Sequence, residues 1–175
     1  MVTATNEPAE VFQIPHNRTA EQAVLGSLLL DNSLIDEAIT LVFPTDFYIK
    51  SNRTIYEAMI RLQENGSAID PVLLEKELTR TKQLESIGGM AYVASLLDGV
   101  VRTSNLAHYT QILREETRYR ELLKISGQMR AAVLSRKKDA QSLCLEYEQL
   151  ISTIYNDPHQ QWFVSSAEIA NQDVS

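Results

Sequence analysis

The glycines come first, because a nucleotide site usually needs them beside a lysine. A phosphate-binding loop has the pattern Gly-x-x-x-x-Gly-Lys-Ser/Thr, in which backbone N–H groups and the lysine hold the phosphates. The only adjacent glycines, Gly88 and Gly89, are followed by Met90, Ala91 and Tyr92, so the lysine is missing. We interpret the pair as a place where two helices meet closely. We expect no nucleotide and no other cofactor to bind this chain.

Metal and nucleophile chemistry also lack candidates. His16, His108 and His159 are far apart and are not flanked by cysteines or carboxylates at ligand spacing, so we expect no metal site. Cys144 lies on an apolar helical line, which favours a buried structural thiol over a nucleophile. Solvated helix faces explain the neighbouring carboxylates, Glu75 with Glu77 and Glu115 with Glu116. The chain therefore offers no catalytic residue.

The composition is that of an ordinary globular protein. The chain has 175 residues, of which 44% are hydrophobic and 22% charged, so a packed core is feasible. No apolar run reaches the roughly 18 residues of a membrane span, and the N-terminus has no basic region followed by an apolar stretch. A single cysteine excludes an internal disulfide. We expect a cytoplasmic protein, or a stromal one if it is plastid-encoded, with no membrane partner.

The charge is negative overall but unevenly distributed. A net charge of −7 argues against strong binding of nucleic acid by this chain, since such affinity comes largely from cations on phosphates. Half of the 16 basic residues nevertheless lie in residues 104–139. An acidic partner could dock on four of them, although a solvated helix face explains the same charges. These four candidate docking residues are Arg114, Arg118, Arg120 and Lys124.

Helix start and stop signals recur through the first hundred residues. Thr19 begins a capping box that Gln22 completes, and an apolar helical face follows. Pro44 stops a second helix. Asp70 is a strong helix start, because aspartate caps the helix while Pro71 at its first position loses no needed hydrogen bond.

No stretch alternates with period two, so the predicted fold class is all-α. We expect a globular helical bundle, then a protruding two-helix hairpin and a linker. The aromatic side chains of Phe47 and Tyr48 are predicted to plug the core of the bundle. The predicted units are a flexible tail at 1–14, a helical globular subdomain at 15–104, a long helical hairpin for dimerisation at 105–156, and a linker with the start of a further helix at 157–175.

The hairpin begins with one long helix at about 105–136. This stretch has no proline, and at 1.5 Å per residue it would span roughly 45 Å, more than a small globule needs. Its middle, 114–121, is polar nearly all round, which predicts a neck that leaves the globule through solvent. Residues 136–139 are predicted to turn, with Asp139 capping a second helix over 140–155.

The hairpin carries more apolar surface than one chain needs. Its second helix has two apolar lines, and a protruding hairpin would leave one of them exposed. Pairing with a second copy would give a four-helix bundle with two-fold symmetry, whereas a hairpin that folds back would bury both lines within one chain. The residues predicted for self-association are Leu122, Ile125, Met129, Val133, Leu143, Tyr147, Leu150 and Ile154.

The last nineteen residues, 157–175, are predicted to form a linker. Trp162 and Phe163 make an apolar patch among polar residues, and with Ile169 they could anchor the linker on a neighbouring domain. Ser165 starts a helical pattern that soon ends, which suggests a truncated linker helix.

Several blocks of the sequence resemble the DnaB-type replicative DNA helicases. The opening block, Pro-His-Asn-Arg-Thr-Ala-Glu-Gln-Ala-Val-Leu-Gly-Ser-Leu-Leu-Leu-Asp at 15–31, is the most specific. Arg-Thr-Ile-Tyr-Glu-Ala-Met at 53–59, Ile-Gly-Gly-Met-Ala-Tyr at 87–92 and Asn-Leu-Ala-His-Tyr at 105–109 continue it. The resemblance covers about residues 14–155.

The resemblance implies a role in assembly. In that family, helical globules bear hairpins that pair, and three dimers form a collar on a hexameric ring at the replication fork. The collar is a docking platform for primase and in some members for a helicase loader, as part of the primosome. A linker helix reaches a RecA-like motor that binds ATP, Mg²⁺ and single-stranded DNA. This chain lacks the motor, so the resemblance implies that it is not itself an enzyme and that the parent chain is an ATP-dependent helicase.

A different class of function stays open beside this one. The chain could be a stand-alone helical adaptor similar to the helicase-binding domain of primase. The opening block disfavours this alternative, because it resembles the helicase and not the adaptor. Both alternatives predict that the chain does not bind ATP.

Overall fold

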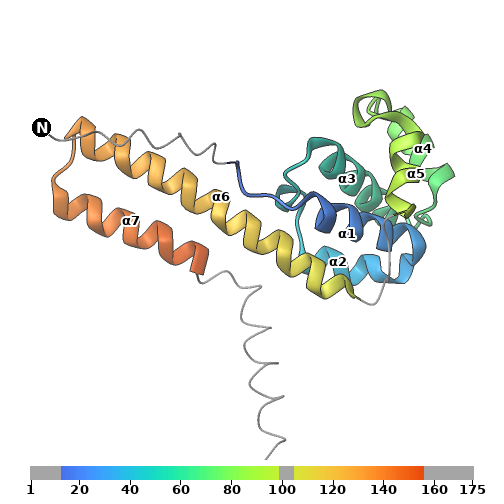
Figure 1. Cartoon of the computed structure of the whole chain (residues 1–175), viewed down its shortest axis with the longest axis horizontal. Helices are drawn as coiled ribbons and strands as arrows, with labels where there is room; N and C mark the ends of the chain where they lie inside the picture. Colours follow the sequence, from blue (N-terminus) through green and yellow to red (C-terminus); the bar gives the residue numbers. More distant parts are fainter. Residues whose placement is uncertain (1–12, 99–104, 156–175) are drawn as a thin grey trace, which may run out of the picture.

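The computed structural model describes residues 13–98 and 105–155. In this part of the chain there are seven α-helices and no strand, so the predicted all-α class is confirmed. Helices α1 to α5 form a globule, α6 runs out of it, and α7 folds back along α6 to make the predicted hairpin (Figure 1). The helices are α1 (Arg18–Leu30), α2 (Ile35–Leu41), α3 (Lys50–Glu64), α4 (Pro71–Arg80), α5 (Gly89–Asp98), α6 (Leu106–Ser135) and α7 (Ala140–Tyr155), with short 3₁₀ turns at Asn32–Leu34, Pro44–Asp46 and Glu85–Ile87. None of the helices in the described ranges has the length and apolarity to cross a bilayer.

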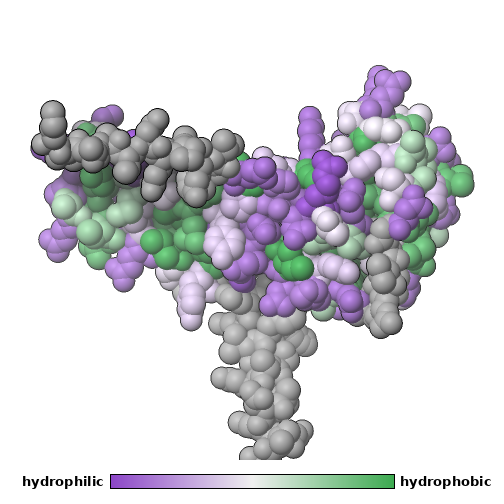
Figure 2. All heavy atoms as spheres, in the orientation of Figure 1, coloured by the Kyte–Doolittle hydropathy of each residue, from purple (hydrophilic) through white to green (hydrophobic). Residues whose placement is uncertain are grey.

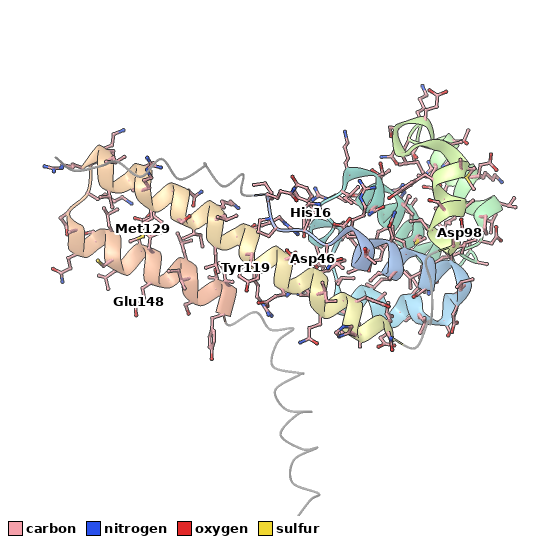
Figure 3. All side chains as sticks on the ribbon, in the orientation of Figure 1. His16, Asp46, Asp98, Tyr119, Met129 and Glu148 are labelled. Carbon is pink, nitrogen blue, oxygen red and sulfur yellow. The ribbon has the colours of Figure 1, made fainter. Side chains whose placement is uncertain are left out.

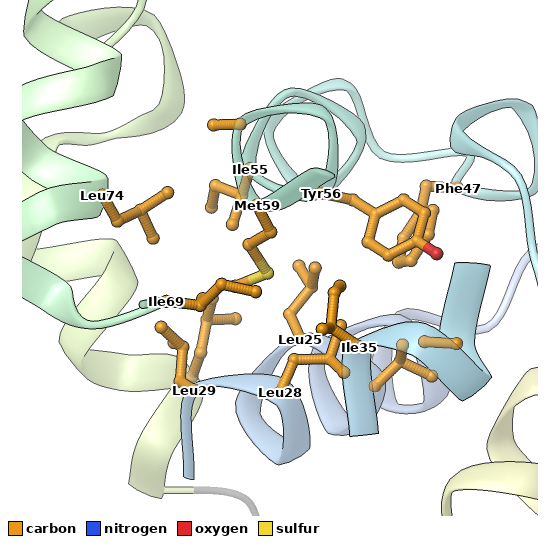
Figure 4. Packing of buried hydrophobic residues seen from close by; sticks show 14 of the residues in the cluster. Leu25, Leu28, Leu29, Ile35, Phe47, Ile55, Tyr56, Met59, Ile69 and Leu74 are labelled. Carbon is orange, nitrogen blue, oxygen red and sulfur yellow. The ribbon is translucent and has the colours of Figure 1, made fainter. Parts of the chain in front are cut away.

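The core of the globule forms around α1 and α3. Leu25 and Leu28 of α1 pack with Tyr56 and Met59 of α3, and all four are fully buried (Figure 4). The side chain of Phe47 fills part of this core as predicted, and the centre of its ring lies 4.8 Å from the centre of the Tyr56 ring. The prediction for Tyr48 is wrong, because its side chain is 42% exposed and lies beside Arg120, in the middle of α6.

The helix starts are confirmed in one case and corrected in another. The Asp70 carboxylate accepts the backbone N–H of Leu73 at 2.8 Å, as a cap should. The capping box predicted at Thr19 is wrong, because the N-cap of α1 is Asn17, two residues earlier. The side chain of Asn17 accepts the N–H of Ala20, and Gln22 donates to the hydroxyl of Tyr92.

A buried carboxylate performs the capping that α3 lacks. Ile49, the N-cap residue of α3, has no side chain that can accept a hydrogen bond. The Glu21 carboxylate instead accepts the backbone N–H of Tyr48 at 2.9 Å, that of Ile49, and the side-chain amide of Asn52 at 2.8 Å. Burial raises the pKa of Glu21, and these hydrogen bonds oppose the rise. Glu21 belongs to α1, and its negative charge lies at the positive, N-terminal end of the α3 dipole. This carboxylate therefore links α1 to α3.

The glycine pair has a different role from the one predicted. Gly88 and Gly89 both have positive φ, +100° and +68°, and Gly88 is the left-handed residue that ends the 3₁₀ turn. A Cβ atom on Gly88 would lie 3.3 Å from the Cβ of Tyr92. The backbone conformation, and not a close approach of two helices, therefore accounts for the glycines.

The hairpin turn forms where it was predicted. Arg136 is left-handed, with φ of 49°, and ends α6 after 30 residues. The Asp139 carboxylate accepts the N–H of Ser142 at 2.9 Å and starts α7. Gly66 also has positive φ, in the turn after α3.

Helices α3 and α4 are joined by a cluster of three charges. Glu77 of α4 is nearly buried and accepts from Arg61 of α3 at 2.7 Å and from Arg80 at 2.8 Å. Hydrogen bonds from Arg80 and Arg61 lower the pKa of Glu77 to about 2.

We expect this cluster to make stability depend on pH in the acid range. Since the folded-state pKa of Glu77 is lowered, its contribution is present above the unfolded value near 4.5 and is lost as the pH falls toward 2. Glu77→Gln should therefore lower the free energy of unfolding by about 1.5 kcal/mol at pH 7 and by much less at pH 2.5, as measured by urea titration. An equal loss at both pH values would contradict the ion-pair assignment.

Candidate functional site

The eight predicted self-association residues fall into three groups, of which the first lies inside the hairpin. Ile125, Leu143 and Tyr147 are at most 8% exposed and form a cluster inside the hairpin, with Ala132 and Ile154 packed against it. These residues hold α6 against α7 within one chain. Packing between the two helices of one hairpin therefore accounts for half of the eight residues predicted for self-association.

The other residues leave one side of the hairpin apolar and exposed. Leu122, Met129 and Val133 of α6 follow one another at spacings of seven and four, and are 38% to 51% exposed. Cys144, Ile151 and Tyr155 of α7 have the same spacings and are also exposed. Such spacings place each set along one side of its helix. The buried thiol predicted for Cys144 is therefore wrong.

A shallow groove shows that the two stripes lie on the same side. It has a volume of about 260 Å³ and is lined by apolar side chains of both helices together with Glu115 and Arg118. The apolar side chains are those of Tyr119 and Leu122 of α6 and of Ile151, Ile154 and Tyr155 of α7. Figure 2 shows hydrophobic residues gathered over the hairpin, while the middle of the molecule, where α6 meets the globule, is mostly hydrophilic. We call this surface the hairpin face; its residues are Tyr119, Leu122, Met129, Val133, Cys144, Ile151 and Tyr155.

Four residues of the hairpin face are absent from the eight predicted for self-association: Tyr119, Cys144, Ile151 and Tyr155. The last three form the second apolar line of the second hairpin helix, whereas Tyr119 was missed altogether. Tyr119 lies in the polar stretch 114–121, and the polar residues around it dominated the interpretation of that stretch. Its spacing of three residues before Leu122 was the available signal. Tyr119 and Met129 are labelled along α6 in Figure 3.

A second groove between α6 and α7 has a different chemistry. Its volume is about 420 Å³, and Ile125, Leu150 and Ile154 contribute its apolar lining. Around them lie polar and charged side chains, so we call it the basic groove. These side chains are Arg114, Thr117, Arg118, Glu121, Lys124, Gln128 and Thr153. Leu150, predicted for self-association, belongs to this groove and not to the hairpin face.

The neck does not cross solvent as predicted, because two of its arginines bind the globule. The guanidinium of Arg114 is 15% exposed and lies 3.5 Å from the carboxylate of Asp46, which is buried and accepts the N–H of Phe43. Arg120 donates to the backbone carbonyl of Asp46 at 2.8 Å and to that of Pro15 at 3.0 Å. Asp46 is seen beside α6 in Figure 3.

The same junction includes aromatic contacts. The guanidinium of Arg120 lies 5.8 Å from the ring centre of Tyr48, and the ring of His16 lies 4.7 Å from that of Tyr48. Arg114 and Arg120 are thus used to hold α6, and their predicted exposure is wrong. Lys124 is 61% exposed and Arg118 is 26% exposed, so these two remain candidates for docking a partner.

Some predicted residues lie outside the part of the chain that the structure describes. Trp162, Phe163 and Ile169, the predicted linker anchors, are among them. Within residues 13–98 and 105–155, no group of three histidine, cysteine or acidic side chains is arranged to hold a metal ion.

Comparison with protein families gives one match over most of the described chain. Residues 13–115 match the family described as the DnaB-like helicase N-terminal domain. The replicative DNA helicase DnaB of Geobacillus stearothermophilus is 30% identical over 158 residues, which cover 90% of this chain and 35% of the relative. That of Treponema pallidum is 38% identical over 64% of this chain and 26% of its own length. The chain thus spans about a third or less of the length of these relatives.

Solved structures have the same fold. The crystal structure of the N-terminal domain of DnaB helicase from Mycobacterium tuberculosis has a TM-score of 0.73 and 27% identity, and the match covers 80% of this chain and 99% of that one. A DnaB-like replicative helicase, described together with its interactions with primase, has a TM-score of 0.61 and 29% identity over 76% of this chain and 31% of that one.

We expect Asp46 to be the residue on which the junction depends. Asp46→Ala removes the buried acceptor for Phe43 and leaves Arg114 without its carboxylate, which should cost about 2–3 kcal/mol in urea unfolding at pH 7. Asp36→Ala is the matched control, because Asp36 is exposed on α2 and accepts a hydrogen bond from the side-chain amide of Gln63 at the surface. If the two variants lost the same stability, the junction would not be held by Asp46.

Proposed function

The chain belongs to the family of DnaB-like helicase N-terminal domains, and from this premise we propose that it is the assembly and partner-docking module of a hexameric replicative DNA helicase. The proposed unwinding of DNA at the replication fork takes place in a motor outside this chain, which spans only about a third of its relatives. The ATP and Mg²⁺ that the motor uses are proposed to bind there. We propose the cytoplasm as the site of action.

The observation that carries this proposal is the hairpin face. Its large apolar side chains lie on two helices, on one side of the hairpin, and have no cover within the described chain. Extended exposed apolar surface of this kind usually marks a protein interface. Two hairpins placed face to face around a two-fold axis form a four-helix bundle that buries both faces at once.

The division of the predicted residues supports pairing over the alternative of a self-sufficient hairpin. Ile125, Leu143 and Tyr147 already close the hairpin, so its second set of apolar residues has no internal partner to pack against. Leu122, Met129 and Val133 are therefore proposed to contact the second copy. In the hexamer, three such pairs would form the collar.

Primase is the partner proposed for the paired module, and a helicase loader is a further one. Support comes from the 29% identical helicase that is described with its interactions with primase. The alternative of a stand-alone adaptor is disfavoured, because the relatives over most of this chain are replicative helicases. For the module itself we propose no enzymatic activity and little direct binding of nucleic acid.

Pairing can be tested by molar mass from light scattering after size exclusion, over a wide range of concentrations. We expect the chain to approach twice its 19.7 kDa. Leu122→Asp combined with Ile151→Asp should bring the mass down to that of a monomer, because it places two charges on each hairpin face.

A second double variant provides the control for this experiment. Leu134→Asp with Leu145→Asp changes two exposed leucines of the same helices that lie outside the hairpin face. This variant should keep the dimer mass. A wild-type chain of 19.7 kDa at every concentration would overturn the pairing.

The same variants test primase docking. If the paired hairpins form the platform, the wild type and the control should bind the helicase-binding domain of a bacterial primase in a gel-filtration mixture, and the Leu122→Asp, Ile151→Asp variant should bind it much more weakly. Equal binding by all three would place the primase site on a single globule.

A further inference from the structure

The basic groove is a second hollow of the hairpin, and eight of its ten lining residues are not shared with the groove of the hairpin face. Leu150, one of its apolar residues, is 36% exposed although it lies between the two helices. Three cations line the groove with one carboxylate, that of Glu121, which lies 3.2 Å from the ammonium group of Lys124. The lining therefore keeps an excess of positive charge, whereas the whole chain has a net charge of −7. The groove therefore suits a segment that combines apolar side chains with negative charge.

Arg118 gives a more specific indication. Its Nη1 is 3.2 Å from the carboxylate of Glu115, but its Nε is buried and has no hydrogen-bond acceptor among the described residues. A buried donor without an acceptor costs free energy of about 1–3 kcal/mol. An acceptor supplied by a segment lying in the groove would remove that cost.

The chain itself contains a segment with the required composition. Residues 157–175 hold three acidic residues, Asp157, Glu168 and Asp173, and no lysine or arginine. They also contain Trp162 and Phe163, which are large enough to fill an apolar groove.

The position of this segment in the chain favours docking on the same molecule. Helix α7 ends at Tyr155, and Thr153 and Ile154 just before it line the basic groove. Trp162 follows Tyr155 by seven residues, and seven residues of fully extended chain reach up to about 24 Å. The segment can therefore turn back into the groove without strain.

We propose that residues 157–175 dock in the basic groove of their own hairpin. Trp162 and Phe163 pack on Leu150 and its apolar neighbours, and the carboxylates of the segment face Arg118 and Lys124. The hairpin thereby fixes the direction in which the chain continues beyond α7. This inference does not depend on pairing, because the basic groove shares only Arg118 and Ile154 with the groove of the hairpin face.

Trp162 is the only tryptophan of the chain, so its fluorescence reports the docking directly. In the full chain, we expect acrylamide to quench Trp162 less than it quenches the free peptide 157–175, and its emission to lie at shorter wavelength. Raising the salt concentration to 1 M should move both values toward those of the peptide, because the charge pairs at the groove are screened.

A charge-reversal pair provides the specific test. Lys124→Glu should bring the quenching of Trp162 close to that of the peptide, while Arg130→Glu, an equal charge change on an exposed part of α6 outside the groove, should leave it as in the wild type. Both variants should keep their helical circular dichroism and the molar mass of the wild type, so that a failure of docking is separated from a failure of pairing.

Three results would overturn the proposal. Trp162 could be as accessible in the wild type as in the peptide. It could become accessible in the Leu122→Asp, Ile151→Asp variant and not in Lys124→Glu, which would place the segment on the hairpin face. Lys124→Glu could weaken binding of the primase domain and leave Trp162 unchanged, which would assign the basic groove to primase.

Discussion

The contacts between α6 and the turn at residues 44–48 determine how the globule and the hairpin can be used in assembly. Arg114 and Arg120 bind the carboxylate and the carbonyl of Asp46, and Arg120 also binds the carbonyl of Pro15. Because the Arg114–Asp46 pair is mostly shielded from water, salt screens it less than it would screen a surface pair. The globule and the hairpin are therefore held in one relative orientation, so that the hairpin projects along a defined direction.

A fixed direction matters for a module that assembles by symmetry. When two hairpins pair around a two-fold axis, each globule is carried to a position set by the angle at its own junction. If the junction were flexible, two hairpins could still pair, but the globules would have no defined position in the pair. Helix α6 can be longer than the globule because its first part packs on α1 and α2, and its later part packs on α7 through the cluster around Ile125.

The hairpin is also divided across its width. Its interior is a small cluster around Ile125, Leu143 and Tyr147, one side is apolar, and the groove toward Arg118 and Lys124 is largely charged. Two chemically different surfaces on one hairpin allow two different occupants, because an apolar interface excludes charge while a charged groove selects for the opposite sign. A small element can in this way serve both self-association and the positioning of another segment.

The sequence alone determined the features that are local. The all-α class, the start of α4 at Asp70, the turn at 136–139 and the length of α6 follow from capping residues, proline and helical spacing, which act over a few residues. The resemblance of the opening block to replicative helicases was also visible there, and the family match agrees with it.

Only the tertiary structure decided what each polar or apolar side chain meets. Glu21 caps a helix that begins 29 residues later, and Arg114 meets Asp46 across 68 residues, so no local pattern could pair them. A stripe of helical spacing likewise shows that a face is apolar but not what covers it, which is why Ile125 and Leu122 looked alike until one proved buried and the other exposed. Local spacing fixes the shape of an element, whereas its partners depend on how distant segments come together in space.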